Sequence, residues 1–180
     1  MEMLKNIMDY YFTFHYGIGC VIGLVVFVCY LYILRKRQKN QGQSVSVKDI
    51  LCILVLSIYL VFLLGGTVLN RTIGEEWRFN LRLFWSYQEV FNTRDVALLW
   101  QIVYNVLVFI PWGILVSEII HATSKFGLVV LSAAGLSFAI ELTQLVFRLG
   151  LAEFDDVFHN TLGAVIGYGL WGMWRKWMKH

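Results

Sequence analysis

Five long apolar runs, separated by short polar connections, dominate the pattern of this 180-residue chain. They cover approximately residues 16–34, 50–70, 97–120, 126–147 and 157–174. A helix of about 20 apolar residues crosses a hydrocarbon core roughly 30 Å thick. A segment in lipid must be helical, because no water is available there to the backbone amides and carbonyls. The pattern therefore predicts an all-α, polytopic integral membrane protein, with residues 1–180 forming one domain and five transmembrane helices forming one bundle.

The longest connection, residues 71–95, has a different periodicity. Apolar side chains alternate with basic or amide side chains in the order Trp77, Arg78, Phe79, Asn80, Leu81, Arg82 and Leu83. Alternation with a period of two indicates an extended stretch with one apolar face and one basic face. We expect either an interfacial outer loop anchored by tryptophans or a lid that contacts a ligand.

Composition supports the membrane assignment, and the distribution of charge adds an orientation. Hydrophobic residues make up 58% of the chain, whereas a soluble domain is roughly half apolar. Most basic residues follow the first segment, follow the fifth segment, or lie between the third and fourth: Arg35, Lys36, Arg37, Lys39, Lys48, Lys125, Arg175, Lys176 and Lys179. Because cytoplasmic loops carry an excess of Lys and Arg, we expect the N-terminus outside and the C-terminus in the cytoplasm.

Polar residues interrupt the outer ends of the third and fourth segments. Glu141, Gln144 and Arg148 are spaced by three and then four residues, so they form one stripe on the fourth helix. Gln101 and Asn105 are four apart and share one face of the third helix.

The start of the fifth segment carries a third polar face at the same depth. Asp156 and Asn160 share one side of this helix, and Asp155 and His159 share another. A carboxylate in lipid costs at least about 2.5–3.5 kcal/mol, so such groups normally face the bundle interior. We therefore predict one polar pocket, built by three helices, in the outer half of the bundle.

Each of these residues also has a purely structural interpretation. Asp155 or Asp156 would cap the fifth helix, whose dipole and free amides favour an acid. Asn105 would join neighbouring helices, and Glu141 with Arg148 would form a buried ion pair. The combination of polar groups on three helices favours a site over these separate roles.

Small residues indicate where helices pack closely. Gly163 and Gly167 are four apart, a spacing that lets helix backbones approach in lipid. Pro111 removes one helical hydrogen bond and, together with Gly113, predicts a kink in the third helix.

Three motifs resemble those of the VanZ-like family of small bacterial membrane proteins, named after an accessory teicoplanin-resistance determinant. They are "NVLVFIPWG" at 105–113, "ELTQ" at 141–144 and "GLAEFDDVFHNTLGAVIGYG" at 150–169, within a core of about residues 78–172. The matching positions are Asn105, Phe109, Pro111, Gly113, Glu141, Gln144, Asp155, Asp156, Asn160, Gly163 and Gly167. Leu83 stands where family members often have a proline, and His159 is a less usual choice. The resemblance implies a protein of the bacterial cytoplasmic membrane.

Binding is the first of two functions that fit these residues. The pocket would take an amphiphile, such as a lipoglycopeptide antibiotic or a lipid-linked wall precursor, and contribute to teicoplanin-type resistance or cell-envelope homeostasis. Arginine forks match phosphate oxygens. The expected ligand-binding residues are Arg78, Arg82, Asn105, Gln144, Arg148, Asp155 and Asn160. Membrane lipids are the other expected partners, with no nucleic acid.

The second function is an intramembrane enzyme acting on a lipid or lipid-linked cell-wall precursor. Glu141 and Asp156 would then be the catalytic acid–base pair. We expect no cofactor and no metal, although Asp155 with these two acids would offer the oxygen ligands that a hard divalent cation prefers. A third interpretation is a scaffold or transporter accessory whose polar cluster only sets the register of the helices.

Overall fold

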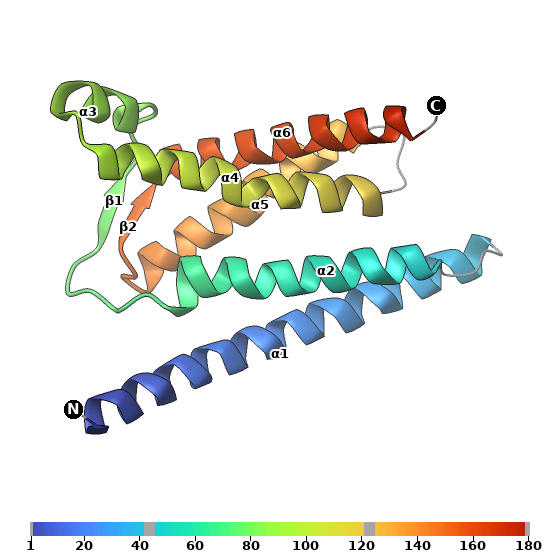
Figure 1. Cartoon of the computed structure of the whole chain (residues 1–180), viewed down its shortest axis with the longest axis horizontal. Coiled ribbons are helices and arrows are strands. Elements are labelled where there is room, and N and C mark those ends of the chain that lie inside the picture. Colours follow the sequence, from blue (N-terminus) through green and yellow to red (C-terminus); the bar gives the residue numbers. More distant parts are fainter. Residues whose placement is uncertain (1, 42–45, 121–124, 179–180) are drawn as a thin grey trace. The chain divides into compact units, whose positions relative to one another are not determined.

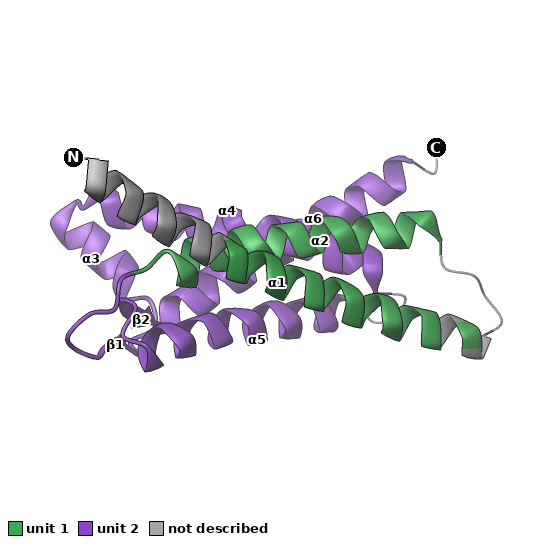
Figure 2. Ribbon diagram, turned by 90° about the horizontal axis from the view of Figure 1, so that it is seen from below, with its two compact units in different colours: residues 1–71 green, residues 72–180 purple. Residues whose placement is uncertain are grey.

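The computed structural model describes residues 2–41, 46–120 and 125–178 of the chain. Its elements, in order, are α1 (Glu2–Gln41), α2 (Val47–Leu64), a π-helical turn (Gly65–Leu69), β1 (Arg78–Asn80), α3 (Trp85–Thr93), α4 (Val96–Ile119), α5 (Lys125–Val146), β2 (Leu151–Glu153) and α6 (Phe154–Trp177), as Figure 1 shows. The predicted helical character is confirmed, and the departure from an all-α fold is one pair of short strands. The chain divides into two compact units, residues 1–71 and 72–180, which are coloured separately in Figure 2.

Four helical stretches in the described part of the chain are long and apolar enough to cross a membrane. They are Gly17–Lys36, Val47–Leu69, Val96–Ile119 and Phe126–Val146. α6 has 24 residues, which is long enough, but its ends carry Asp155, Asp156, Arg175 and Lys176, and it is not among the four. The chain is thus a multi-pass membrane protein, while a fifth span stays a prediction. The orientation of the protein in the membrane also stays a prediction. It rests partly on Lys179, which lies outside the described residues.

In the first unit, α1 and α2 pack against each other through small residues. A Cβ atom added at Gly23 would lie 2.6 Å from Cγ2 of Val61 and 3.3 Å from the carbonyl oxygen of Ser57. One turn earlier, a Cβ at Gly19 would lie 3.2 Å from Cγ1 of Val61. Glycines four residues apart therefore let the two helices approach closely.

In the second unit, α4 and α6 run parallel and make the closest helix contact, backbone against backbone (Figure 1). An added Cβ at Gly163 would lie 2.0 Å from the carbonyl oxygen of Val106, and one at Gly167 would lie 2.2 Å from that of Ile110. From the other side, a Cβ at Gly113 would lie 2.1 Å from the carbonyl oxygen of Ala164. No side chain fits at these three positions without separating the helices.

α5 follows α4 in the chain and runs antiparallel to it, back toward the end of the bundle where α6 begins (Figure 1). Four fully buried apolar residues form the centre of its packing: Phe109, Val129, Ala133 and Ala164. The indole Nε1 of Trp112 donates to Oγ of Ser132, 3.1 Å away, which joins α4 to α5. At the far end of the bundle, Glu118 on α4 accepts a 2.7 Å hydrogen bond from Nε1 of Trp171 on α6.

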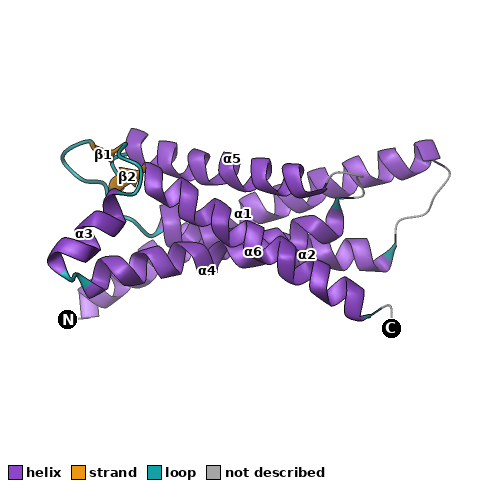
Figure 3. Cartoon of the chain, turned by 90° about the horizontal axis from the view of Figure 1, so that it is seen from above, coloured by secondary structure: helices purple, strands orange, loops and turns teal. Residues whose placement is uncertain are grey.

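The connection predicted as an outer loop instead contains ordered elements. β1 pairs with β2 in parallel, in the register Arg78 to Leu151, Phe79 to Ala152 and Asn80 to Glu153. α3 follows, and Figure 3 shows it and both strands at the same end of the second unit. The extended stretch expected from the alternating pattern is therefore real over residues 78–80, where it forms a strand.

The glycine contact leads to a test with a matched control. Gly163→Ala places a methyl group against the backbone of α4, so we expect it to lower the free energy of unfolding by about 1–3 kcal/mol. Gly169→Ala on the same helix places its methyl group where nothing lies within 4 Å. It should leave stability unchanged or raise it by up to about 1 kcal/mol, because Ala favours a helix over Gly. Denaturant titration in detergent measures both variants, and equal stabilities would contradict the close approach.

Candidate functional site

The site lies at the end of α5, along β2 and at the beginning of α6, which follow one another in the chain. α5 closes with a Schellman motif: the amide of Leu149 donates to the carbonyl of Gln144 at 2.8 Å, and that of Arg148 to Leu145 at 3.2 Å. The motif needs a left-handed residue, which is Arg148 with a φ of 55°. Gly150 follows with a φ of 142°, a conformation that favours glycine. These two residues turn the chain sharply into β2.

Two glutamates join three elements at this junction. Oε2 of Glu141, on α5, accepts a 2.8 Å hydrogen bond from the backbone amide of Glu153, the last residue of β2. Oε2 of Glu153 in turn accepts from Nε2 of Gln101, on α4, at 2.6 Å. Both glutamates are buried. A buried carboxylate needs hydrogen-bond donors, so these contacts fix how α4, α5 and β2 meet.

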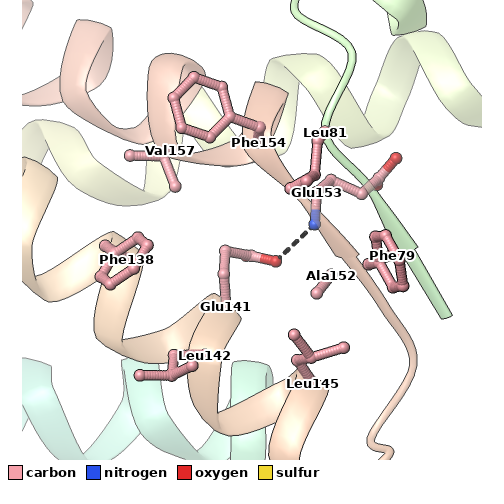
Figure 4. A pocket seen from close by; sticks show the side chains of 10 residues that line it. All are labelled: Phe79, Leu81, Phe138, Glu141, Leu142, Leu145, Ala152, Glu153, Phe154 and Val157. Atoms are coloured by element: carbon pink, nitrogen blue, oxygen red, sulfur yellow. Dashed lines mark hydrogen bonds between the residues drawn. The ribbon is translucent and has the colours of Figure 1, made fainter. Parts of the chain in front are cut away.

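A pocket of about 260 Å³ opens beside Glu141 (Figure 4). Its lining consists of Phe79, Leu81, Phe138, Glu141, Leu142, Leu145, Ala152, Glu153, Phe154 and Val157. β1 and the residue after it form one wall, α5 forms the opposite wall, and β2 with the start of α6 closes the end. In Figure 4 the Glu141 side chain points toward the amide of Glu153, whereas the Glu153 carboxylate points away from it. The pocket is therefore apolar with one acidic group in its wall.

Asp155 does not face this pocket but holds the beginning of α3. Its Oδ1 accepts from the amide of Phe84 at 2.5 Å, and its Oδ2 accepts from both the amide and the hydroxyl of Ser86, at 3.0 and 2.7 Å. The residue that precedes α3, Phe84, makes no capping bond with its own side chain. Asp155, which is fully buried, therefore caps α3 rather than its own helix.

His159, one turn further along α6, meets the same helix. Its Nε2 lies 2.9 Å from the hydroxyl of Tyr87, and the two rings meet edge to face at 5.2 Å. Burial raises the pKa of Tyr87, and the charge of Asp155 raises it further, so the phenol keeps its proton at neutral pH. Phe84 and Phe158 form a second edge-to-face pair at 5.2 Å. Asp155 and His159 thus bind the first turn of α3 along one face of α6.

Asn160 faces the other side, toward α5. Its Nδ2 donates to Oγ of Ser137 at 2.7 Å, and both residues are buried. Three buried polar atoms on α4 and α6 have no hydrogen-bond partner among the described residues: Nδ2 of Asn105, Nδ1 of His159 and Oδ1 of Asn160. Such atoms carry a desolvation cost and leave capacity for a further donor or acceptor.

The three predicted arginines lie at the edge of the site. The guanidinium of Arg148 lies 5.2 Å from the ring centroid of Trp77 and donates to the carbonyl of Glu75 at 3.2 Å. Arg78 lies on β1 beside the pocket residue Phe79, and its side chain is exposed, as is that of Arg82. Arg148 therefore binds the preceding loop, and no ion pair between Arg148 and Glu141 is observed in the described part of the chain.

The structure brings only some of the predicted residues together. Glu141 lines the pocket, whereas Asp156, half-buried in the first turn of α6, is not among its lining residues. The predicted packing residues Phe109, Gly113, Gly163 and Gly167 lie in the α4–α6 contact, and Pro111 lies inside α4. Residues not singled out from the sequence are Ser86, Tyr87, Ser137 and the pocket side chains other than Glu141, Phe79 and Leu81; the last two belong to the alternating stretch. Ser137 had a signal, since it lies four residues before Glu141 on the same stripe of α5.

Comparison with known proteins gives one family and one relative. The profile of the VanZ/LLP1 family matches residues 50–175. The chain is 33% identical over 81 residues to Protein VanZ of Enterococcus faecium. That match covers 43% of this chain and 48% of the relative, so the chain spans about half of the relative's length. No solved structure matches the chain.

The Tyr87–His159 contact can be tested by removing a single oxygen atom. Tyr87→Phe leaves the buried Nε2 of His159 without its observed partner, so we expect a loss of about 1–3 kcal/mol in the free energy of unfolding. Tyr104→Phe is the matched control, because Tyr104 is 59% exposed and should lose less than about 0.5 kcal/mol. Denaturant titration of both variants decides: indistinguishable curves would show that the contact contributes nothing.

Proposed function

Because the chain belongs to the VanZ/LLP1 family, we propose that it binds the apolar part of an amphiphile in the pocket beside Glu141 and contributes to teicoplanin-type resistance. The amphiphile is a lipoglycopeptide tail or a lipid-linked wall precursor in the outer leaflet of a bacterial cytoplasmic membrane. With the N-terminus outside, the end of the second unit that carries the pocket faces the cell surface.

The chemistry of the pocket wall is the observation that carries this proposal. All of its ten lining residues except Glu141 and Glu153 are apolar. Apolar sites with a few placed polar groups are typical of small-molecule binding. Each methylene group of a ligand that enters such a site contributes about 0.8 kcal/mol. An alkyl or acyl chain is the ligand component that fits this surface.

The polar part of the ligand is expected at the edge of the pocket. Glu141 supplies the one acidic group of the wall, with its Oε2 already accepting from the amide of Glu153, and an acidic group suits a hydroxyl, amide or ammonium group next to the apolar chain. Arg78, the first residue of β1, and Arg82, two residues after β1, are both exposed, and a phosphate would find guanidinium donors there. Both features favour an amphiphile over a purely apolar lipid chain.

Binding is better supported than catalysis by the same geometry. An enzyme acting through Glu141 and Asp156 needs both groups at the reacting atoms. Asp156 is not among the pocket residues, and the observed bond of Glu141 is to a backbone amide. No observation in the described residues brings these two carboxylates into one site.

Drug susceptibility provides the cellular test. The wild-type gene, expressed in a Gram-positive host that lacks it, should raise the inhibitory concentration of teicoplanin without raising that of vancomycin. Leu142→Trp fills the pocket and should abolish this difference, whereas Leu131→Trp, at a 71% exposed position on the same helix, should keep it. An unchanged teicoplanin-to-vancomycin ratio with the wild-type gene would contradict the resistance role.

Direct binding provides the biochemical test. Purified protein in nanodiscs should be labelled by a photoreactive dodecylammonium probe on the pocket residues of α5, and unlabelled dodecylamine should compete. Leu142→Trp should weaken binding about tenfold, equivalent to ~1.4 kcal/mol, because the indole occupies the volume of the chain. Leu131→Trp should bind like the wild type. Labelling spread evenly over all exposed helices would mean that the pocket is not a binding site.

A further inference from the structure

We infer that Asp155 is the positioning residue of the pocket: it holds one wall in place and thereby sets how long a ligand stays bound. This inference rests on the proposed function, because it concerns the same pocket. The wall in question is residues 79–84, called here the wall segment. It contributes Phe79 and Leu81 to the lining.

The wall segment is attached at both ends to the same short stretch of chain. At its first end, β1 pairs with β2, with Asn80 opposite Glu153. At its second end, the amide of Phe84 donates to Oδ1 of Asp155. Glu153 and Asp155 are only two residues apart, so the start of α6 holds both ends. Leu81 lies between the two attachments, and Figure 4 shows it beside Phe79 on this side of the pocket.

The second attachment holds an unfavourable backbone conformation. Phe84 has a φ of 64°, in the left-handed region, where a bulky side chain is a genuine outlier. Such a conformation persists only when its surroundings impose it. Asp155 does so by accepting three hydrogen bonds at its carboxylate oxygens, one from Phe84 and two from Ser86. Bonds of this kind are shorter and stronger than those between neutral groups.

The pairing of β1 with β2 cannot by itself hold Phe84 in the left-handed conformation. A two-stranded sheet is marginal by itself, and this one is three residues long on each strand. Tyr87 and His159 support the first turn of α3, and Phe84 also packs edge to face on Phe158, but neither contact is a hydrogen bond to the backbone of Phe84. When the Asp155 attachment is removed, Phe84 is expected to leave the left-handed region, and Leu81 then moves with it. A ligand chain resting on that wall should dissociate faster, while its rate of association changes less.

The adjacent aspartate supplies a matched control. Asp155→Asn and Asp156→Asn each remove one negative charge from the first turn of α6, and therefore the same helix-dipole interaction. Only the first change places an amide NH₂ against the donors of Phe84 and Ser86. A second test variant, Ser86→Ala, leaves Asp155 intact and removes one of its three bonds.

The experiment measures dissociation of the dodecylammonium probe from full-length protein in nanodiscs, together with amide exchange of residues 81–87. Asp155→Asn should speed dissociation about tenfold and Ser86→Ala about threefold, in line with one or more lost hydrogen bonds. Asp156→Asn leaves these three hydrogen bonds in place, so it should change the dissociation rate much less than Asp155→Asn does. Dissociation is followed on the folded fraction only, so lower global stability alone would not alter it. Faster amide exchange in the wall segment should accompany faster dissociation.

The outcomes separate this inference from the function on which it rests. If the wild type binds the probe and both Asp155→Asn and Ser86→Ala release it at the wild-type rate, the role of Asp155 is overturned and the pocket stands. If Asp155→Asn does not fold, Ser86→Ala decides alone. If the wild type shows no pocket binding, the proposed function falls, and the positioning role falls with it.

Discussion

The contact between the backbones of α4 and α6 is the constraint on which the second unit depends. Gly113, Gly163 and Gly167 leave no room for a side chain, so the two helices approach backbone to backbone in this register. That register places the beginning of α6 beside the first turns of α4, where Gln101 reaches Glu153. In lipid, where apolar side chains gain little from leaving the solvent, such close approach supplies the van der Waals contact that holds helices together. The position of the acidic junction follows from it.

The carboxylates at the junction accept hydrogen bonds from backbone amides and so fix the course of the chain there. Glu141 binds the amide of Glu153, and Asp155 binds the first turn of α3. Each carboxylate thereby meets donors that lie far from it in sequence, which offsets the cost of burying it. The same contacts shape the pocket, since Phe79 and Leu81 belong to the segment that these acids hold. Structural roles and the proposed binding role therefore fall on the same few residues, so a substitution at one of them should affect both.

The sequence pattern predicts features that depend on short spacings, such as helices and their faces. It does not predict contacts between residues that are far apart in the chain. Long apolar runs gave the helices, and the four-residue spacing of Asp155 and His159 gave their common face. The partners of that face, Ser86 and Tyr87, lie about 70 positions away, and no local periodicity indicates such a distance. The expectation that an acid here caps the fifth helix had the right chemistry, but the bonds observed for Asp155 go to α3. The apolar character of the pocket was also missed, because Phe138 and Leu142 look like ordinary membrane-facing residues in the sequence.

The register in which β1 pairs with β2 determines which side chains of β1 face the pocket. Successive side chains of a strand point to opposite faces, so a slip of one position exchanges its two faces completely. A pairing shifted by one position would bring Arg78 and Asn80 toward the cavity and turn Phe79 away from it. A hydrocarbon-lined wall would become a cationic one without any substitution among the lining residues. The register of this pairing therefore decides whether the wall presents apolar or cationic side chains.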